Sequence, residues 1–253
     1  MLINYLFKIG LKFNFGPLRP LFKIIASIFR YYFTIFTTKS KEKSIIFIAG
    51  LPKSGTTWLE NILTLDGEFT SIMPPDITIW EQKFSRSNNY IPSHDIFSKL
   101  PKGKWVIKLH CKFSIELDLF LKKNNIKTIV IHRNLEKVLD SHLHYALKTK
   151  FHPDHNDLKK IIRKDEALRW LSQKYKREYS EWITSWKNQK NTYNLTYDDL
   201  LKDTNHEVTS ILKFLEIDIS KDMITKIINK NSIDKLRSKS VHKEFYRGAQ
   251  LKK

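Results

Sequence analysis

Cysteine is almost absent from this chain of 253 residues, which contains only Cys111. A single thiol excludes an intrachain disulfide and every metal site that needs two or more cysteines. It is compatible with a reducing compartment, and we therefore expect a cytoplasmic protein. The length suits one α/β domain with a full hydrophobic core and an appendage.

Acidic residues are scarce beside the basic ones. The chain has 26 aspartates and glutamates against 45 lysines and arginines, a formal net charge of +19. This balance favours anionic partners such as a nucleotide with several phosphates, an acidic membrane surface, nucleic acid or an acidic saccharide. The lysines are spread along the chain, which is also typical of a solvated surface. No DNA- or RNA-binding signature is present, so we expect no nucleic-acid partner.

The chain also lacks an apolar run long enough to cross a membrane. Its most apolar stretch, Leu21 to Phe36, contains Lys23 and Arg30, whereas a span needs about 20 apolar residues. We assign residues 1–43 to a basic, aromatic-rich arm and 44–253 to the main domain. Two interpretations of the arm stay open: an amphipathic helix that makes peripheral membrane contact, or a helix packed on the domain. A cleaved signal peptide is not expected, because the apolar stretch starts late and no clear small-residue cleavage site follows it.

The segment Ser44 to Leu65 predicts a strand, a turn and a helix. Apolar, largely β-branched residues 45–49 lead through Gly50 and Gly55 into apolar residues at helical spacing, namely Trp58, Leu59, Ile62 and Leu63. Glycines allow a tight turn whose N–H groups, together with the positive end of the helix, bind an anionic group. Lys53 adds a positive charge, and the segment adds hydroxyl donors from Ser54, Thr56 and Thr57.

The lysine of a nucleotide-triphosphatase loop is missing from its place after the second glycine, because Thr56 and Thr57 follow Gly55. The segment Pro52 to Trp58, PKSGTTW, instead resembles the 5′-phosphosulfate loop of sulfotransferases that use 3′-phosphoadenosine 5′-phosphosulfate (PAPS). The resemblance implies an α/β fold, a three-layer P-loop-like domain with a central parallel sheet flanked by helices. It also implies PAPS as co-substrate, no metal, and a set of cofactor-binding residues, Lys53, Ser54, Gly55, Thr56, Thr57 and Trp58.

Two polar residues end a second predicted strand, Trp105 to His110. Lys108 and His110 are two positions apart, so they share a face of the strand, and open α/β sheets bind ligands beyond the carboxyl ends of their strands. Lys108-Leu109-His110 resembles the family's Lys-Thr-His segment, with Leu in place of Thr. The resemblance implies that His110 is the catalytic base and that Lys108 and Lys53 also serve catalysis.

A third strand, Thr128 to His132, precedes Arg133, an N-capping Asn134 and a helix predicted over 135–147. An arginine fork and a helical hydroxyl at Ser141 make a plausible phosphate clamp. The segment resembles the family's 3′-phosphate motif, which implies that Arg133 and Ser141 bind that phosphate.

Three further segments resemble adenine-side and tail motifs of the family. Tyr197-Asp198-Asp199 resembles a Tyr-Glu-Asp segment whose Tyr contacts the nucleotide, and Ser232 lies where the family has a serine near the adenine. Phe245-Tyr246-Arg247-Gly248 resembles the tail motif Phe-x-Arg-Lys-Gly, although its lysine is absent. The resemblance implies cofactor contacts from Tyr197, Ser232, Arg247 and Gly248. Either the adjacent lysines compensate for the missing one or nucleotide affinity is reduced.

Other stretches carry less specific signals. Residues 165–187 predict a long helix with an apolar core-facing stripe, 204–216 a helix that covers the sheet, and 85–101 a loop over the site. We expect no metal site among His142, His144, His152 and His155, because 142 and 144 lie far apart around a helix and neither pair has a carboxylate in ligand context.

The sequence therefore predicts a sulfotransferase that moves a sulfuryl group from PAPS to a hydroxyl or amine of a small-molecule or saccharide acceptor, with His110 as general base. Residues 66–100 contain no recognisable acceptor code. Two alternatives remain: a P-loop nucleotide kinase, and a non-catalytic protein that binds anions or a membrane surface.

Overall fold

The structure, a computed structural model, describes Ile25 and residues 43–72, 100, 102–150 and 152–235. Three predictions fall largely or wholly outside the described residues. They are the arm of residues 1–43, the loop at 85–101, and the cofactor contacts of Arg247 and Gly248.

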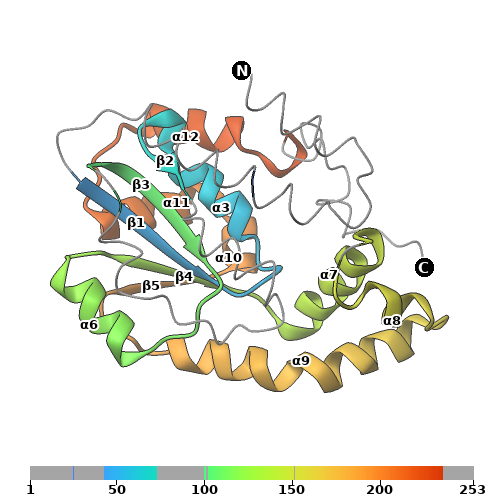
Figure 1. The fold of residues 1–253 in the computed structure, drawn as a ribbon. Helices are drawn as coiled ribbons and strands as arrows, with labels where there is room; N and C mark the ends of the chain where they lie inside the picture. Colours follow the sequence, from blue (N-terminus) through green and yellow to red (C-terminus); the bar gives the residue numbers. More distant parts are fainter. Residues whose placement is uncertain (1–24, 26–42, 73–99, 101, 151, 236–253) are drawn as a thin grey trace.

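A five-stranded sheet forms the centre of the molecule (Figure 1). Its strands are β1 (Lys43–Gly50), β2 (Thr70–Ser71), β3 (Gly103–Leu109), β4 (Thr128–His132) and β5 (Thr192–Thr196). They are paired in the order β2-β3-β1-β4-β5, and every pair is parallel. The predicted central parallel sheet is confirmed.

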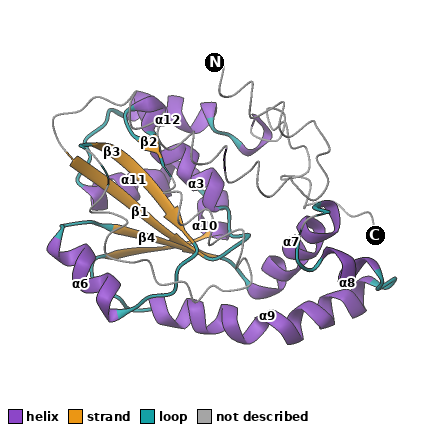
Figure 2. Ribbon diagram, viewed as in Figure 1, coloured by secondary structure: helices purple, strands orange, loops and turns teal. Residues whose placement is uncertain are grey.

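Helices cover both faces of this sheet (Figure 2). They are α3 (Thr56–Leu63), α6 (Ile115–Lys123), α7 (Leu135–Lys148), α8 (His155–Lys159), α9 (Lys164–Trp186), α10 (Tyr197–Lys202), α11 (Thr204–Leu215) and α12 (Lys221–Lys230). The helices predicted over 135–147, 165–187 and 204–216 are confirmed to within two residues at each end. In the described part of the chain, none of the helices is both long and apolar enough to pass through a bilayer.

The alternation of β1 separates two apolar cores. Ile46 and Ile48 pack with α3, α11 and α12, whereas Phe47 and Ala49 pack with α6, α7 and α9. Successive side chains of a strand point to opposite faces, so a strand that is apolar at every position must be covered on both sides. The predicted three-layer arrangement follows from this pattern.

The order of the strands marks the carboxyl ends of β1 and β4 as the expected place for a ligand. The chain leaves β3 on one side of β1 and continues in β4 on the other side, and such a reversal is where open α/β sheets bind ligands. The Leu51 N–H donates to the Ile131 carbonyl at 2.9 Å, which ties the loop after β1 to the end of β4. Asn134 caps α7 as predicted, since its Oδ1 accepts from the Glu136 and Lys137 N–H groups at 2.9 and 3.3 Å.

Candidate active site

The loop between β1 and α3 has the backbone of an anion cradle. Gly55, the N-cap of α3, has φ 79°, and no side chain in the described part of the chain caps the helix there, so first-turn N–H groups are left for another acceptor. A Cβ at Gly50 would lie 2.1 Å from Thr56 Cγ2, and one at Gly55 would lie 2.4 Å from Tyr197 Cδ2. Both positions therefore require glycine, which explains the spacing seen in the sequence.

Two buried polar atoms, in the segments that follow β1 and β4, have no hydrogen-bond partner among the described residues. One is the Ser54 hydroxyl oxygen in the loop, and the other is Arg133 Nε at the end of β4. A buried donor without an acceptor costs about 1–3 kcal/mol. Both side chains belong to the predicted nucleotide site, and phosphate oxygens would supply the missing acceptors. The residues present therefore fit an anionic nucleotide.

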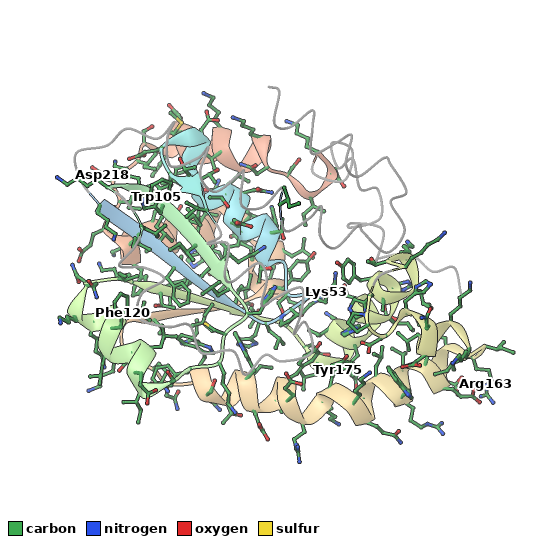
Figure 3. The ribbon with its side chains drawn as sticks, viewed as in Figure 1. Lys53, Trp105, Phe120, Arg163, Tyr175 and Asp218 are labelled. Carbon is green, nitrogen blue, oxygen red and sulfur yellow. The ribbon has the colours of Figure 1, made fainter. Side chains whose placement is uncertain are left out.

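Lys53 projects from the loop toward α7 (Figure 3). Its ammonium lies 4.0 Å from the centroid of the Tyr145 ring. Burial and the positive charge of Lys108 lower the pKa of Lys53 to about 8. A bound anion would reverse this effect, because it favours the charged form.

Lys108 meets a different environment. Its ammonium lies 3.2 Å from Glu60 Oε2 and 3.5 Å from Thr57 Oγ1, both on α3, and Glu60 also accepts from Ser71 at 2.5 Å. The charge of Lys108 is therefore balanced by a carboxylate. Glu60 is not among the site residues predicted from the sequence, although its place three residues after Thr57 puts it on the same face of the helix.

His110 follows β3 and lies half-buried beside the loop. Its Nδ1 is 2.6 Å from the Gly50 carbonyl oxygen. A carbonyl only accepts, so Nδ1 carries the proton, and in the neutral ring Nε2 holds the lone pair. This is the tautomer that can take a proton from another molecule.

Three predicted nucleotide residues form one aromatic and cationic group. The Arg133 guanidinium lies 4.3 Å from the centroid of Tyr197, whose ring meets Trp58 edge-on at 6.0 Å. Trp58 Nε1 donates to the Asn231 carbonyl at 2.9 Å, which brings the neighbouring Ser232 to the same corner. Segments from four parts of the chain thus meet where the adenine was predicted.

Ser141 lies half-buried on α7, one turn before Tyr145. Because residues four apart share a helix face, Ser141 lies on the side of α7 that meets Lys53. Within the described residues, no hydrogen bond joins Ser141 to Arg133, so the structure leaves the clamp formed by these two residues as a prediction.

The expectation that the histidines of this region lack a carboxylate is wrong. Fully buried Asp154 places Oδ2 3.0 Å from His142 Nε2 and 3.7 Å from His152 Nδ1. The turn after α7 brings it back to His142 from 12 residues away, a return that helical spacing does not reveal. Asp154 also accepts from Lys174 at 2.6 Å and from Tyr175 at 2.5 Å.

This cluster has strongly shifted pKa values. Burial raises the pKa of Asp154, but hydrogen bonds from His142, Lys174 and Tyr175 outweigh burial and hold it well below its usual range. Burial lowers the pKa of His152 to about 4, and the neighbouring His142 acts in the same direction. At neutral pH His152 is uncharged, and the buried carboxylate takes its hydrogen bonds from His142, Lys174 and Tyr175.

Comparisons with known proteins agree on one family. The sulfotransferase domain matches residues 43–250. Sulfotransferase 1 family member D1 of Rattus norvegicus is 26% identical over 212 residues, which cover 76% of this chain and 66% of that protein. Sulfotransferase 1A1 of Bos taurus is 24% identical over 195 residues, covering 76% and 65%. The chain thus spans slightly less than two thirds of the length of these relatives.

Solved structures share the fold. Mouse sulfotransferase SULT7A1 complexed with PAP aligns with 86% of this chain and 73% of its own, with a TM-score of 0.59 and 22% identity. Retinol dehydratase in complex with androsterone and the inactive cofactor PAP covers 85% of this chain and 74% of its own, with a TM-score of 0.55 and 16% identity.

Proposed function

This chain belongs to the sulfotransferase domain family, and from that membership we propose that it transfers a sulfuryl group from PAPS to a hydroxyl or amine of a small-molecule or saccharide acceptor. One observation carries the proposal beyond family membership. Among the described residues, the buried Ser54 hydroxyl and Arg133 Nε have no hydrogen-bond partner, and half-buried Lys53 lies in the same loop as Ser54. One polyanionic nucleotide would supply acceptors for Ser54 and Arg133 and an opposite charge for Lys53.

Each end of the nucleotide has proposed partners. The 5′-phosphosulfate takes the N–H groups and side chains of Lys53, Ser54, Gly55, Thr56 and Thr57. The 3′-phosphate takes Arg133 and Ser141, and the adenine lies by Trp58, Tyr197 and Ser232. Arg247 and Gly248, outside the described residues, complete the proposed set of contacts.

The proposed chemistry uses His110 as the base. Nε2 takes the proton of the acceptor while the acceptor oxygen or nitrogen bonds to sulfur, and the bond from sulfur to the 5′-phosphate oxygen breaks. The electron pair of that bond stays on the phosphate, which leaves as 3′-phosphoadenosine 5′-phosphate (PAP). Lys53 and the loop N–H groups stabilise this growing charge. Lys108 neutralises sulfuryl oxygens, and its ion pair with Glu60 keeps its ammonium beside Thr57.

Calorimetric titration with PAP and, separately, with ATP tests the nucleotide site. We expect tight binding of PAP, weakened tenfold or more by Arg133→Ala because a charge-assisted contact is lost. The matched control is Arg163→Ala, an exposed arginine at the start of α9 that pairs with Asp165, and it should leave affinity unchanged. Failure of PAP to bind would overturn the proposal, and magnesium-dependent turnover of ATP would support the kinase alternative instead.

The role of His110 as general base is tested by the kinetics of an acceptor. This acceptor is first found by screening compounds for release of PAP. His110→Ala should lower kcat by about 100- to 10,000-fold, the usual contribution of a general base, while PAP affinity is retained. His206→Ala, at an exposed histidine of α11, is the control. Unchanged turnover in His110→Ala would remove His110 from the mechanism.

A further inference from the structure

We propose that Tyr145 and His152 form an aromatic wall that positions the ammonium of Lys53, and that buried Asp154 holds this wall in place. The role rests on the proposed function, because Lys53 acts there on the leaving phosphate. Neither Tyr145 nor Asp154 lies in a motif that the sequence singled out, and the fold brings both to the loop from α7 and from the turn before α8.

Direct contact between the wall and the lysine comes from Tyr145. The Lys53 ammonium lies 4.0 Å from the ring centroid, well inside the range of about 6 Å in which the negative face of an aromatic ring attracts a cation. This attraction favours the charged form where burial and Lys108, which faces Lys53 from β3, oppose it. It also fixes the direction of a flexible side chain before substrate arrives.

The Tyr145 ring is itself held by His152. Their rings meet edge-on, with centroids 5.4 Å apart and an interplanar angle of 85°. His152 Nδ1 accepts the backbone N–H of Asp154 at 3.2 Å, which fixes the ring orientation. His152 also meets the His142 ring edge-on at 5.0 Å, so it is clamped between α7 and its own turn.

Asp154 ties the wall to two helices. Its carboxylate accepts from His142 of α7 at 3.0 Å, and from Lys174 and Tyr175 of α9 at 2.6 and 2.5 Å. Figure 3 shows Tyr175 on α9 on the side of the sheet where α7 packs. Hydrogen bonds to an ionised group are about twice as strong as neutral ones, so this support is stiff.

The same cluster has the residue types of a metal site, since His142, His152 and Asp154 offer ligand atoms within 4.8 Å of one another. However, Asp154 Oδ2, the oxygen nearest both histidines, already accepts from His142 and Tyr175, and Lys174 neutralises the carboxylate from the other oxygen. A carboxylate oxygen has about two lone-pair positions. The geometry therefore assigns the cluster to hydrogen-bonded support of the wall.

The test compares two substitutions of Tyr145 that keep its apolar cover. Tyr145→Leu removes the ring, whereas Tyr145→Phe keeps it. The lysine titration is followed by NMR of protein labelled with ¹³C at the lysine ε-carbon, and the Lys53 signal is assigned with Lys53→Arg. We expect the pKa of Lys53 to fall by about one unit in Tyr145→Leu, because the attraction of the ring is lost, and to stay unchanged in Tyr145→Phe.

Kinetics provide a second readout. The alkaline limb of kcat/KM reports ionisations of the free enzyme, so it should move to lower pH by the same amount in Tyr145→Leu and return in Tyr145→Phe. An unchanged Lys53 titration in Tyr145→Leu would overturn the positioning role. If the native protein shows no sulfuryl transfer but the titration shifts as expected, the proposed function fails and the positioning of Lys53 stands. Tyr145→Met replaces Tyr145→Leu if circular dichroism shows that the latter is unfolded.

Discussion

The two faces of the sheet are covered by different kinds of side chain. On the face covered by α3, α11 and α12, apolar side chains such as Ile62 and Leu212 fill the core. On the face covered by α7 and α9, the core also encloses His142 and Asp154. These two polar residues are linked to Lys53 of the anion cradle through His152 and Tyr145.

The difference shows what each face requires. An apolar core tolerates changes that conserve volume and apolar character. A buried carboxylate requires particular donors at particular distances, because any loss leaves a charge without compensation. The face that packs behind Lys53 is therefore the one specified by individual contacts.

The largest expected difference between the two faces is the effect of conservative substitutions on the free energy of unfolding. Asp154→Asn keeps the shape but loses the charge that Lys174 and His142 need, and we expect a loss of about 3 kcal/mol in the free energy of unfolding. Leu212→Met should cost less than about 1.5 kcal/mol, whereas Leu212→Ala should cost about 2–5 kcal/mol. Urea denaturation at pH 7 measures all three. Equal costs for Asp154→Asn and Leu212→Met would contradict the distinction between the faces.

A decrease in pH should lower the free energy of unfolding through the face covered by α7 and α9, which contains His152. The pKa of His152 is about 4 in the folded protein and about 6.5 in an unfolded chain. Between these values the unfolded state binds the proton and the folded state does not, so stability falls as pH decreases, by about 2–3 kcal/mol between pH 6.5 and 4. Below pH 4, the lowered pKa of Asp154 acts in the same direction.

Urea denaturation at a series of pH values between 7 and 4.5 measures this slope. His152→Asn, whose side-chain oxygen can still accept the Asp154 N–H, should flatten it, while His206→Ala, at an exposed position of α11, is the control. A slope that is the same with and without His152 would show that this histidine is not the group involved.

Gly55, at the start of α3, lies between the core under α3 and the candidate nucleotide site. Gly55→Ala places a Cβ at φ 79° and 2.4 Å from the Tyr197 ring, whereas Gly67→Ala, at φ 107°, meets nothing within 4 Å. We expect Gly67→Ala to cost about 1–2 kcal/mol from the backbone alone. Gly55→Ala should cost about 1 kcal/mol more from displacing the ring, and should also weaken PAP binding. Thermal unfolding and calorimetry measure the two effects, and equal behaviour of both variants would exclude a role for the Tyr197 contact.

The smallest expected effect is an increase in the stability of the protein. Burial lowers the pKa of Lys53 to about 8, so holding it charged at pH 7 costs stability. Lys53→Met should stabilise the protein without nucleotide by about 1–2 kcal/mol, part of the gain being offset by the lost attraction to Tyr145. The cost is fully present below pH 8 and decreases toward pH 10.4, since only the unfolded state keeps the proton there.

Urea denaturation at pH 7 measures this gain. The control is Lys226→Met, an exposed lysine that pairs with Asp66 and should change stability by less than about 0.5 kcal/mol. Destabilisation by Lys53→Met would show that the lysine is not strained in the free protein. Loss of PAP affinity in the same variant would show that stability was exchanged for binding.

Features encoded within a few neighbouring residues could be predicted well. The strand, turn and helix around Lys53, the cap at Asn134 and the apolar stripe of α9 depend on local spacing, and all three are confirmed. Contacts between distant segments that lie outside the family motifs could not be predicted. Glu60 beside Lys108 and Asp154 beside His142 belong to no motif, since one lies on an ordinary helix face and the other in a turn.

Sequence alone determined the family resemblance, the layered α/β fold and the chemical types of the candidate site, because these depend on spacing within short segments. Tertiary structure alone decided what each charged group meets: Lys108 a carboxylate, Lys53 an aromatic ring, and Asp154 donors from two helices. These environments set the pKa values and the positions of the reacting groups. They arise from packing between segments far apart in the chain, where no periodicity or motif records which side chains will touch.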